Sequence, residues 1–414
     1  MDQQRNLIIA IALSIAILLG FEYFFGQRQP VHPPAPATQT TAPSTPGTPS
    51  TAMPNAPGAA AAPEAKPRDQ VLAGAPRVAI DTPSLKGSIS LTGARLDDLI
   101  LKKYLETIDK QSPPIVLLSP DGSEHPYFIE YGWVTAPNST VKAPDGTTRW
   151  TASPGALTPQ HPIDLTWDNG SGVRFIRHYA VDDNYMFTVT QTVENKSGQP
   201  VTLYPYALAS HTGNPTTSST YILHEGPIGV LDGTLKEVKY SELKAGKTDE
   251  FKSTGGWLGI TDKYWLTALI PDQQEVVKAR FTSVERGKTE VYQVDYTGAE
   301  QVVPAGGSVS LTDHLFAGAK EVHLLDSYES AYGVPLFDHA IDFGWFYWIT
   351  KPIFLTLDFF YQRIGNFGLA ILLLTVIIKL IFFPLQSKSY RAMSKMKLLQ
   401  PEMEKLKAKY GEDQ

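Results

Sequence analysis

Two stretches of the chain are apolar over the length of a membrane span. Residues 7–25 read LIIAIALSIAILLGFEYFF, with Glu22 as the single charge, and residues 367–385 read FGLAILLLTVIIKLIFFPL. A helix that crosses the hydrocarbon core needs roughly 20 predominantly apolar residues. The pattern therefore predicts two transmembrane helices, placed in segments 1–28 and 365–385, with a cleaved signal peptide as the alternative for the first.

Between residues 71 and 335 the pattern changes to short runs in which Val, Thr, Tyr and Phe alternate with polar residues. Such alternation is typical of strands with one buried face, and Asp-Gly, Asn-Gly and Gly-Gly pairs mark turns between them. The pattern lacks the helix–strand alternation of a parallel sheet, so it predicts a large antiparallel β-sandwich. Examples of the expected strands lie at residues 95–101, 127–133, 173–180, 186–195, 201–210, 264–270, 276–283, 290–296 and 308–316.

Residues 336–364 are crowded with aromatic side chains, and Pro352 interrupts them. Trp and Tyr concentrate at the membrane–water interface, and apolar residues recur at helical spacing from Pro352 onward. The pattern favours an amphipathic helix in the interface plane, with an ordinary buried helix of the β-domain as the alternative. The expected interfacial anchors are Trp345, Tyr347, Trp348 and Lys351.

Residues 29–70 are rich in Pro, Ala and Thr, with eleven prolines between positions 30 and 67. Such a composition buries too little apolar surface to offset the entropy of ordering. The segment is interpreted as a flexible, semi-extended tether rather than an SH3-type ligand.

The C-terminal segment, residues 386–414, is basic and helix-prone. Met and Leu form a stripe along it, and Pro401 is expected to bend or restart the helix. The favoured interpretation is a solvated helix that packs on a partner helix of its own chain.

The charge distribution orients the two predicted spans. Residues 29–342 contain 24 Lys/Arg against 35 Asp/Glu, whereas residues 386–414 contain seven against four. Basic residues next to a span favour the cytoplasmic side, so both ends of the chain are expected in the cytoplasm. Residues 29–342 are then expected outside it, and their acidic balance argues against nucleic-acid binding.

The second predicted span carries one full charge, Lys379, and one helix breaker, Pro384. A lysine inside a transmembrane helix costs about 2.5–3.5 kcal/mol on insertion scales. From the residues alone, snorkelling of Lys379 to the cytoplasmic headgroups is the favoured explanation. Pro384 is expected to break the helix at the cytoplasmic end of the span.

No catalytic or metal-binding motif is present in residues 71–335. The chain has no cysteine, which excludes disulfides and cysteinyl metal sites, and it has no G-x-S-x-G, Walker or H-E-x-x-H motif. His178, His211 and His224 are scattered, with Glu225 following His224. A carbohydrate-binding β-sandwich remains an alternative, although no sequence cluster of carboxylates and aromatics indicates a sugar cleft.

Five segments resemble the Gram-negative YidC membrane protein insertases. These are the opening MDQQRNLIIAIAL, GWLGITDKYWLTALIP (256–271), IDFGWFYWITKPIF (341–354), GNFGLAILLLTVIIKLIFFPL (365–385) and residues 387–411. The order of parts also matches, namely anchor, tether, periplasmic β-domain, interfacial helix, span and basic cytoplasmic helix. Each segment is modest alone, but the ordered set is specific.

The resemblance implies a multi-pass inner-membrane protein with a periplasmic β-supersandwich domain. It implies insertion and folding of nascent inner-membrane proteins, alone or with the Sec translocon, without cofactor, nucleotide or enzymatic activity. The cytoplasmic loop is expected to meet a ribosome or targeting receptor. Further spans of the family are absent, so the sequence is interpreted as an N-terminal portion of an insertase.

The resemblance also gives Lys379 a role. The family carries a basic residue in this span, usually Arg, which lies in a hydrophilic groove open to the cytoplasm and to lipid. Lys keeps the charge but loses the planar five-donor fork of Arg, so only a point-charge role carries over. The competing functions are a membrane-tethered carbohydrate-binding protein and a structural protein that docks Sec components.

Overall fold

The structure is a computed structural model, which describes residues 53–58, 65–137, 139–213, 223–244, 246–287 and 289–410. The predicted first transmembrane helix and the tether up to residue 52 lie outside the described residues. The description below concerns the unit that begins at Met53.

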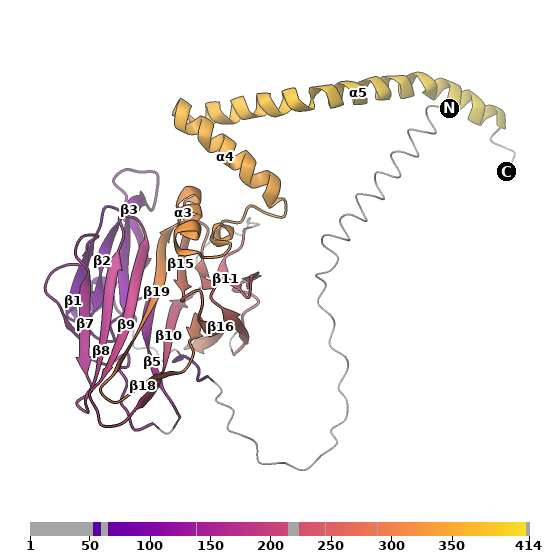
Figure 1. Ribbon diagram of the computed structural model, residues 1–414. Coiled ribbons are helices and arrows are strands. Elements are labelled where there is room, and N and C mark those ends of the chain that lie inside the picture. Colours follow the sequence, from indigo (N-terminus) through magenta and orange to yellow (C-terminus); the bar gives the residue numbers. More distant parts are fainter. Residues whose placement is uncertain are drawn as a thin grey trace, which may run out of the picture. The chain divides into compact units, whose positions relative to one another are not determined.

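The described chain forms two antiparallel sheets (Figure 1). The first has the order β1-β2-β3-β5-β10-β17-β16-β13, with β4 on β3 and β18 on β10. Its strands are β1 Arg77–Asp81, β2 Leu85–Ser90, β3 Leu96–Leu105, β4 Pro114–Leu118, β5 Tyr127–Thr135, β10 Val201–Thr212, β13 Thr248–Thr254, β16 Val276–Arg286, β17 Thr289–Thr297 and β18 Gln301–Val303.

The second sheet has the order β12-β11-β14-β15-β19-β9-β8-β7-β6. Its strands are β6 Thr151–Ala152, β7 Ile163–Asp168, β8 Val173–Val181, β9 Met186–Asn195, β11 Gly226–Leu231, β12 Thr234–Glu237, β14 Trp257–Thr261, β15 Trp265–Ile270 and β19 Ser308–Ala319.

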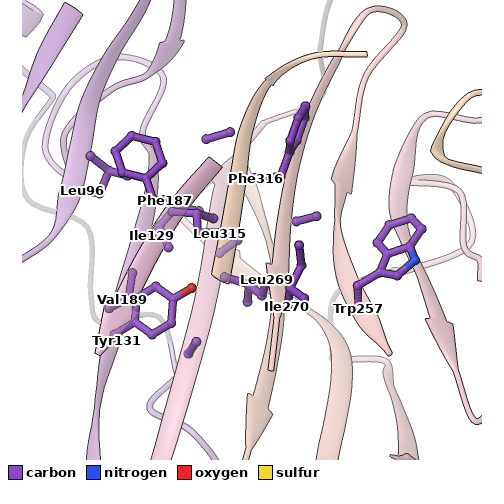
Figure 2. Packing of buried hydrophobic residues seen from close by; sticks show 14 of the residues in the cluster. Leu96, Ile129, Tyr131, Phe187, Val189, Trp257, Leu269, Ile270, Leu315 and Phe316 are labelled. Carbon is purple, nitrogen blue, oxygen red and sulfur yellow. The ribbon is translucent and has the colours of Figure 1, made fainter. Parts of the chain in front are cut away.

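One hydrophobic core lies between the two sheets (Figure 2). Ile129 and Tyr131 of β5 face it from the first sheet, and Phe187 and Val189 of β9 face it from the second. Each pair is two positions apart because alternate residues of a strand point to the same face. The predicted antiparallel β-sandwich is confirmed.

All nine predicted strands are present, and β9 has the predicted bounds. The sequence pattern missed ten shorter or more irregular strands, such as β11 and β14. Every residue of these two strands is buried. A strand covered on both faces has no polar alternation, so its period of two is invisible in the sequence.

The described helices include α2 (Arg68–Ala73), α3 (Val322–Tyr332), the 3₁₀ turn η2 (Phe337–Ala340), α4 (Tyr347–Ile364) and α5 (Phe367–Tyr410). α3 was not expected within residues 71–335, which were predicted to form strands, and η2 lies in segment 336–364, where an amphipathic interfacial helix was predicted. α2 begins inside the predicted tether, so the tether prediction is wrong for those residues.

The helix predicted from Pro352 onward begins five residues earlier, at Tyr347. Pro352 falls in its second turn, where a proline lacks the N–H that would bond the Trp348 carbonyl, and the helix continues through this loss. No residue of α4 is buried, so the alternative of an ordinary buried helix is wrong.

α5 runs without interruption from Phe367 to Tyr410 (Figure 1). The helix therefore neither breaks at Pro384 nor restarts at Pro401, and both predictions are wrong. A proline removes one hydrogen bond and displaces one carbonyl, and the long helical segments on both sides tolerate this loss. Residues 388–405 are exposed, so within the described chain they do not pack on a partner helix as predicted.

A buried carboxyl group makes the stability of the sandwich depend on pH. Burial raises the pKa of Asp313 in β19 to about 7. Between about pH 4 and 7, Asp313 is therefore protonated in the folded state but ionised in the unfolded state. The free energy of unfolding falls as pH rises through this window. Asp313→Asn is expected to flatten this decline, as measured by urea unfolding at pH 5 and pH 8. An unchanged pH dependence would contradict the assignment. Asp262 acts in the same direction, because burial raises its pKa to about 6.

Candidate functional site

α5 contains the membrane-span candidate of the described chain, because residues Phe367–Lys405 are long and apolar enough to cross a bilayer. Large apolar side chains such as Leu372 and Leu380 are exposed along it. Lys379 is also exposed, and within the described residues it forms no ion pair. Segment 367–385 of α5 thus presents one cation on an otherwise apolar surface, and the other charged residues of α5 follow it.

The four expected interfacial anchors divide into two pairs. Trp345 and Trp348 are 85% and 70% exposed, so their rings are available to a membrane interface. Tyr347 and Lys351 instead turn toward the β-domain, where both contact Asp338 of η2. The exposure of the two tryptophans is compatible with the predicted anchor role, and Tyr347 and Lys351 make contacts with the β-domain that were not predicted.

Tyr347, Lys351, Asp326 and Asp338 form a polar cluster, here called the α4 clamp. Lys351 Nζ donates hydrogen bonds to Asp338 Oδ2 at 2.5 Å and to Asp326 Oδ1 of α3 at 2.8 Å. The Tyr347 hydroxyl donates to the same Oδ2 atom. The Tyr347 ring stacks on the His339 ring, with the ring centroids 4.4 Å apart. The α4 clamp ties the first turns of α4 to the end of the β-domain.

The ionisation of the α4 clamp follows from these contacts. Burial alone would raise the pKa of Asp338, but hydrogen bonds from Lys351 and Tyr347 outweigh it and hold the pKa below its ordinary value. Burial opposes the charge of Lys351 as well, yet the two carboxylates raise its pKa above its ordinary value. A charged lysine between two carboxylates is therefore the stable state at neutral pH.

A second contact joins α4 to α3. His323 Nε2 lies 2.8 Å from Asp358 Oδ2, and the same oxygen accepts a hydrogen bond from Gln362. Sequence reasoning missed Asp326, Asp338 and Asp358. Lys351 is 25 and 13 positions from its two partners, and no local spacing rule connects residues so far apart.

A second group of polar residues lies on the outer face of the first sheet. Leu208 of β10 stands opposite Glu130 of β5 and Asp295 of β17, and Asp295 stands opposite Arg280 of β16. Directly opposed residues point to the same face. Ile129, which precedes Glu130 in β5, points to the opposite face of the sheet and belongs to the sandwich core. The face that carries Glu130 and Asp295 therefore points outward.

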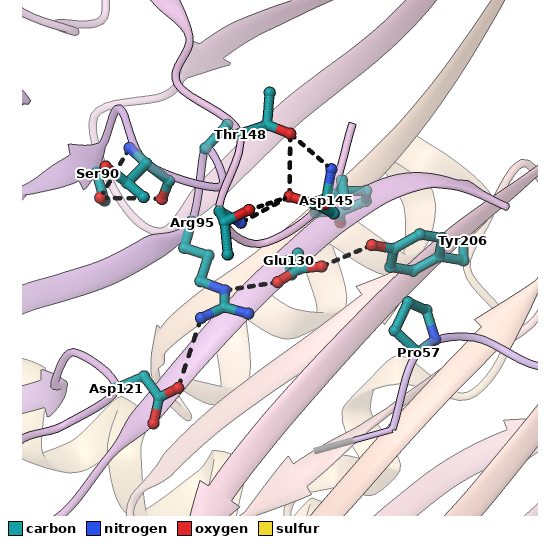
Figure 3. A network of polar contacts seen from close by, with 12 residues as sticks. Pro57, Ser90, Arg95, Asp121, Glu130, Asp145, Thr148 and Tyr206 are labelled. Carbon is teal, nitrogen blue, oxygen red and sulfur yellow. Dashed lines mark hydrogen bonds and ion pairs between the residues drawn. The ribbon is translucent and has the colours of Figure 1, made fainter. Parts of the chain in front are cut away.

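Both carboxylates on this face are paired with arginine. Glu130 accepts hydrogen bonds from Arg95 Nε at 2.5 Å and from the Tyr206 hydroxyl at 2.6 Å (Figure 3). Asp295 binds Arg280 through both oxygens, at 2.9 and 3.0 Å. Sequence reasoning found no such cluster, because its members come from strands far apart in the chain. Since both carboxylates are neutralised, the face does not favour the carbohydrate-binding alternative.

Two of the three scattered histidines have local polar partners, and the third, His211, packs against the Tyr127 ring. His178 Nδ1 lies 2.7 Å from Asp164, and His224 Nε2 lies 3.0 Å from the Pro227 carbonyl. Burial lowers the pKa of His211 to about 4, which keeps its ring neutral. No group of His, Asp and Glu in the described residues has the arrangement of a metal site.

Two family models match the chain. The YidC periplasmic domain matches residues 77–356, and the 60Kd inner membrane protein matches residues 359–414. Among solved structures, a putative aldose 1-epimerase from Escherichia coli K12 is similar at a TM-score of 0.40 and 10% identity, over 59% of this chain and 99% of that one.

Curated relatives match along the whole chain. The membrane protein insertase YidC of Nitrobacter hamburgensis is 51% identical over 424 residues, which cover 100% of this chain and 70% of the relative. The protein of the same name from Bradyrhizobium diazoefficiens is 47% identical over 438 residues, covering 100% of this chain and 71% of the relative. With identity of this level over its full length, the chain belongs to the YidC family of membrane protein insertases.

Proposed function

We propose that the chain inserts and folds inner-membrane proteins through a hydrophilic groove to which α5 contributes Lys379. The single observation that carries this proposal is one exposed cation within segment 367–385 of α5, which is otherwise apolar and long enough to span a bilayer. A YidC insertase needs no catalytic residue for this task, because its work is to lower the cost of moving polar segments into the membrane.

The position of Lys379 fits this role. It lies three residues beyond the middle of segment 367–385, which is roughly 4.5 Å along the helix at 1.5 Å per residue. In the cytoplasmic half of the bilayer its ammonium group would hold water and attract acidic residues of an incoming segment. The polar segment then avoids part of its desolvation cost, and the apolar part leaves sideways into lipid.

The proposed topology has both ends of the chain in the cytoplasm and residues 29–342 in the periplasm. α4 lies at the periplasmic interface, with Trp345 and Trp348 in the headgroup region. The proposed domain division has an anchor (1–28), a Pro-rich tether (29–67) that ends where α2 begins, α2 with the β-domain (68–335), an interfacial segment (336–364), a second span (365–385) and a cytoplasmic segment (386–414). The proposed partners are nascent inner-membrane proteins, the Sec translocon and, through residues 386–414, a ribosome or targeting receptor.

The charge at position 379 is the feature to test. Lys379→Glu in the full-length insertase is expected to reduce insertion of a substrate with an acidic translocated segment about tenfold, because the reversed charge repels that segment. Lys379→Arg should retain insertion. The measurement is protease protection of the translocated segment in cells depleted of their own insertase. If Lys379→Ala and Lys379→Glu both insert substrate like the wild type, the charge is irrelevant and snorkelling explains the lysine.

A further inference from the structure

Residues 53–58, of sequence MPNAPG, lie against the outer face of the first sheet. Ala56 is buried among Phe128, Tyr206 and Leu208. The segment belongs to the Pro-rich stretch that the sequence predicts to be a free tether. Its contacts with β5 and β10 contradict that prediction for these six residues.

Three side chains of the sheet donate hydrogen bonds to this segment. Arg280 Nη2 donates to the Ala56 carbonyl and Gln293 Nε2 to the Pro57 carbonyl, both at 3.0 Å. Lys278 Nζ donates to the Asn55 side-chain oxygen at 2.8 Å. The three groups that the sheet contributes are all donors, and the three groups that the segment contributes are all acceptors.

The donors are held in place by buried groups of the sheet. Asp295 is fully buried and accepts hydrogen bonds from both Arg280 and Gln293, so one carboxylate orients two donors. Tyr206 is held by its hydrogen bond to Glu130 (Figure 3). Arg95 lies over the Phe128 ring, 4.6 Å from the ring centroid. These hydrogen bonds join residues of the sheet to one another, so they orient the donors without help from the segment, which lowers the cost of binding it.

The segment has the chemistry that such a site selects. Proline has no N–H, so an Ala-Pro unit offers carbonyl acceptors with one donor fewer to satisfy. A residue before proline is also biased toward extended conformations, which lowers the entropy lost on docking. The buried position of Ala56 leaves room for a small side chain and excludes a long or charged one.

We propose that this face is a recognition site for extended peptide segments with a small residue followed by proline, and that residues Met53–Gly58 are its ligand in cis. Docking fixes the chain at residues 53–58 and shortens the free part of the tether. An extended segment of the same chemistry from another chain competes for the same donors. The proposal does not depend on the role of Lys379.

The test uses the full chain in detergent micelles and a fluorescein-labelled peptide of sequence STAMPNAPGA. In one variant, residues 53–58 are replaced by GSGSGS, which empties the site and keeps every residue of the sheet. A tethered ligand competes at an effective concentration of about 1 mM, so for a peptide Kd of about 100 μM the wild type should bind about tenfold more weakly than the replaced variant.

Two point variants in the GSGSGS background locate the site. Gln293→Met removes the donor to the Pro57 carbonyl and is expected to weaken peptide binding about fivefold. Lys252→Met is the matched control, because Lys252 stands opposite Lys278 on the neighbouring strand and is exposed. A peptide with arginine in place of the alanine equivalent to Ala56 should not bind.

Equal peptide affinity in the wild type and the GSGSGS variant would overturn occupancy of the site in cis. Absence of peptide binding by the GSGSGS variant, with an unchanged circular dichroism spectrum and unfolding midpoint, would overturn the recognition site itself. Equal weakening by Gln293→Met and Lys252→Met would show a nonspecific effect and also count against the proposal.

Discussion

Replacing Trp257 with alanine is expected to lower the free energy of unfolding of the β-domain by about 3–5 kcal/mol, the range for truncating a large buried aromatic. Trp257 of β14 is fully buried. Its indole N–H donates to the Pro335 carbonyl at 3.1 Å, and its ring packs edge-on against Phe337 of η2 at 5.3 Å. The substitution leaves a cavity and an unsatisfied carbonyl at the point where the sheet supports η2 and, through Asp338, the α4 clamp.

Tyr264 provides the matched control for Trp257. It lies in the same GWLGITDKYWLTALIP segment, but its side chain is 57% exposed. Tyr264→Ala should therefore cost about 1 kcal/mol or less. Urea unfolding of the full chain in detergent, followed by far-ultraviolet circular dichroism, measures both variants. Similar losses for the two would mean that Trp257 does not carry the packing of η2.

Lys351→Met is the second substitution with a large expected effect. It keeps the length of the side chain but leaves the buried carboxylate of Asp338 without its cation. Removing one partner of a buried ion pair costs about 3–5 kcal/mol, and we expect about 3 kcal/mol here because Asp326 is partly exposed. The loss should appear as faster amide hydrogen exchange in η2 and in the first two turns of α4.

A double-mutant cycle separates the ion pair from packing. Asp338→Asn removes the charge that Lys351→Met leaves unpaired, so the double variant should recover part of the exchange protection, with a coupling energy of about 1–3 kcal/mol. Strictly additive losses would show that Lys351 and Asp338 act independently. Lys351→Arg keeps the cation and should remain close to the wild type.

The α4 clamp also defines a pH window. The pKa of Asp338 is held below its ordinary value of 3.8, so its contribution is present above that pH and is lost as pH falls through the lowered value. The pKa of Lys351 is raised above its ordinary value of 10.5, so its contribution is present below that pH and is lost as pH rises through the raised value. Exchange protection of α4 should be flat between about pH 4 and 10 if the ion pair dominates.

The sequence alone determined the class of the β-domain and of the apolar helix that follows it. Period-two alternation is a local property of strands with one wet face, so it located nine strands of the sandwich. The apolar run of α5 and the aromatic residues before it could also be located in the sequence, because span length and aromatic content are local properties. The ordered motifs gave the family before any coordinate was known.

Only the tertiary structure decided which distant residues meet. It joined Lys351 to Asp338, carried α5 through Pro384, and placed Ala56 on a face built from Arg280 and Asp295. The effect of a proline depends on the helix around it. Which residues form an ion pair, or together form the outer face that residues 53–58 contact, depends on strand order and register. These are long-range properties, and the hydrophobic pattern that gives each strand its inner face carries no information about which outward side chains become neighbours.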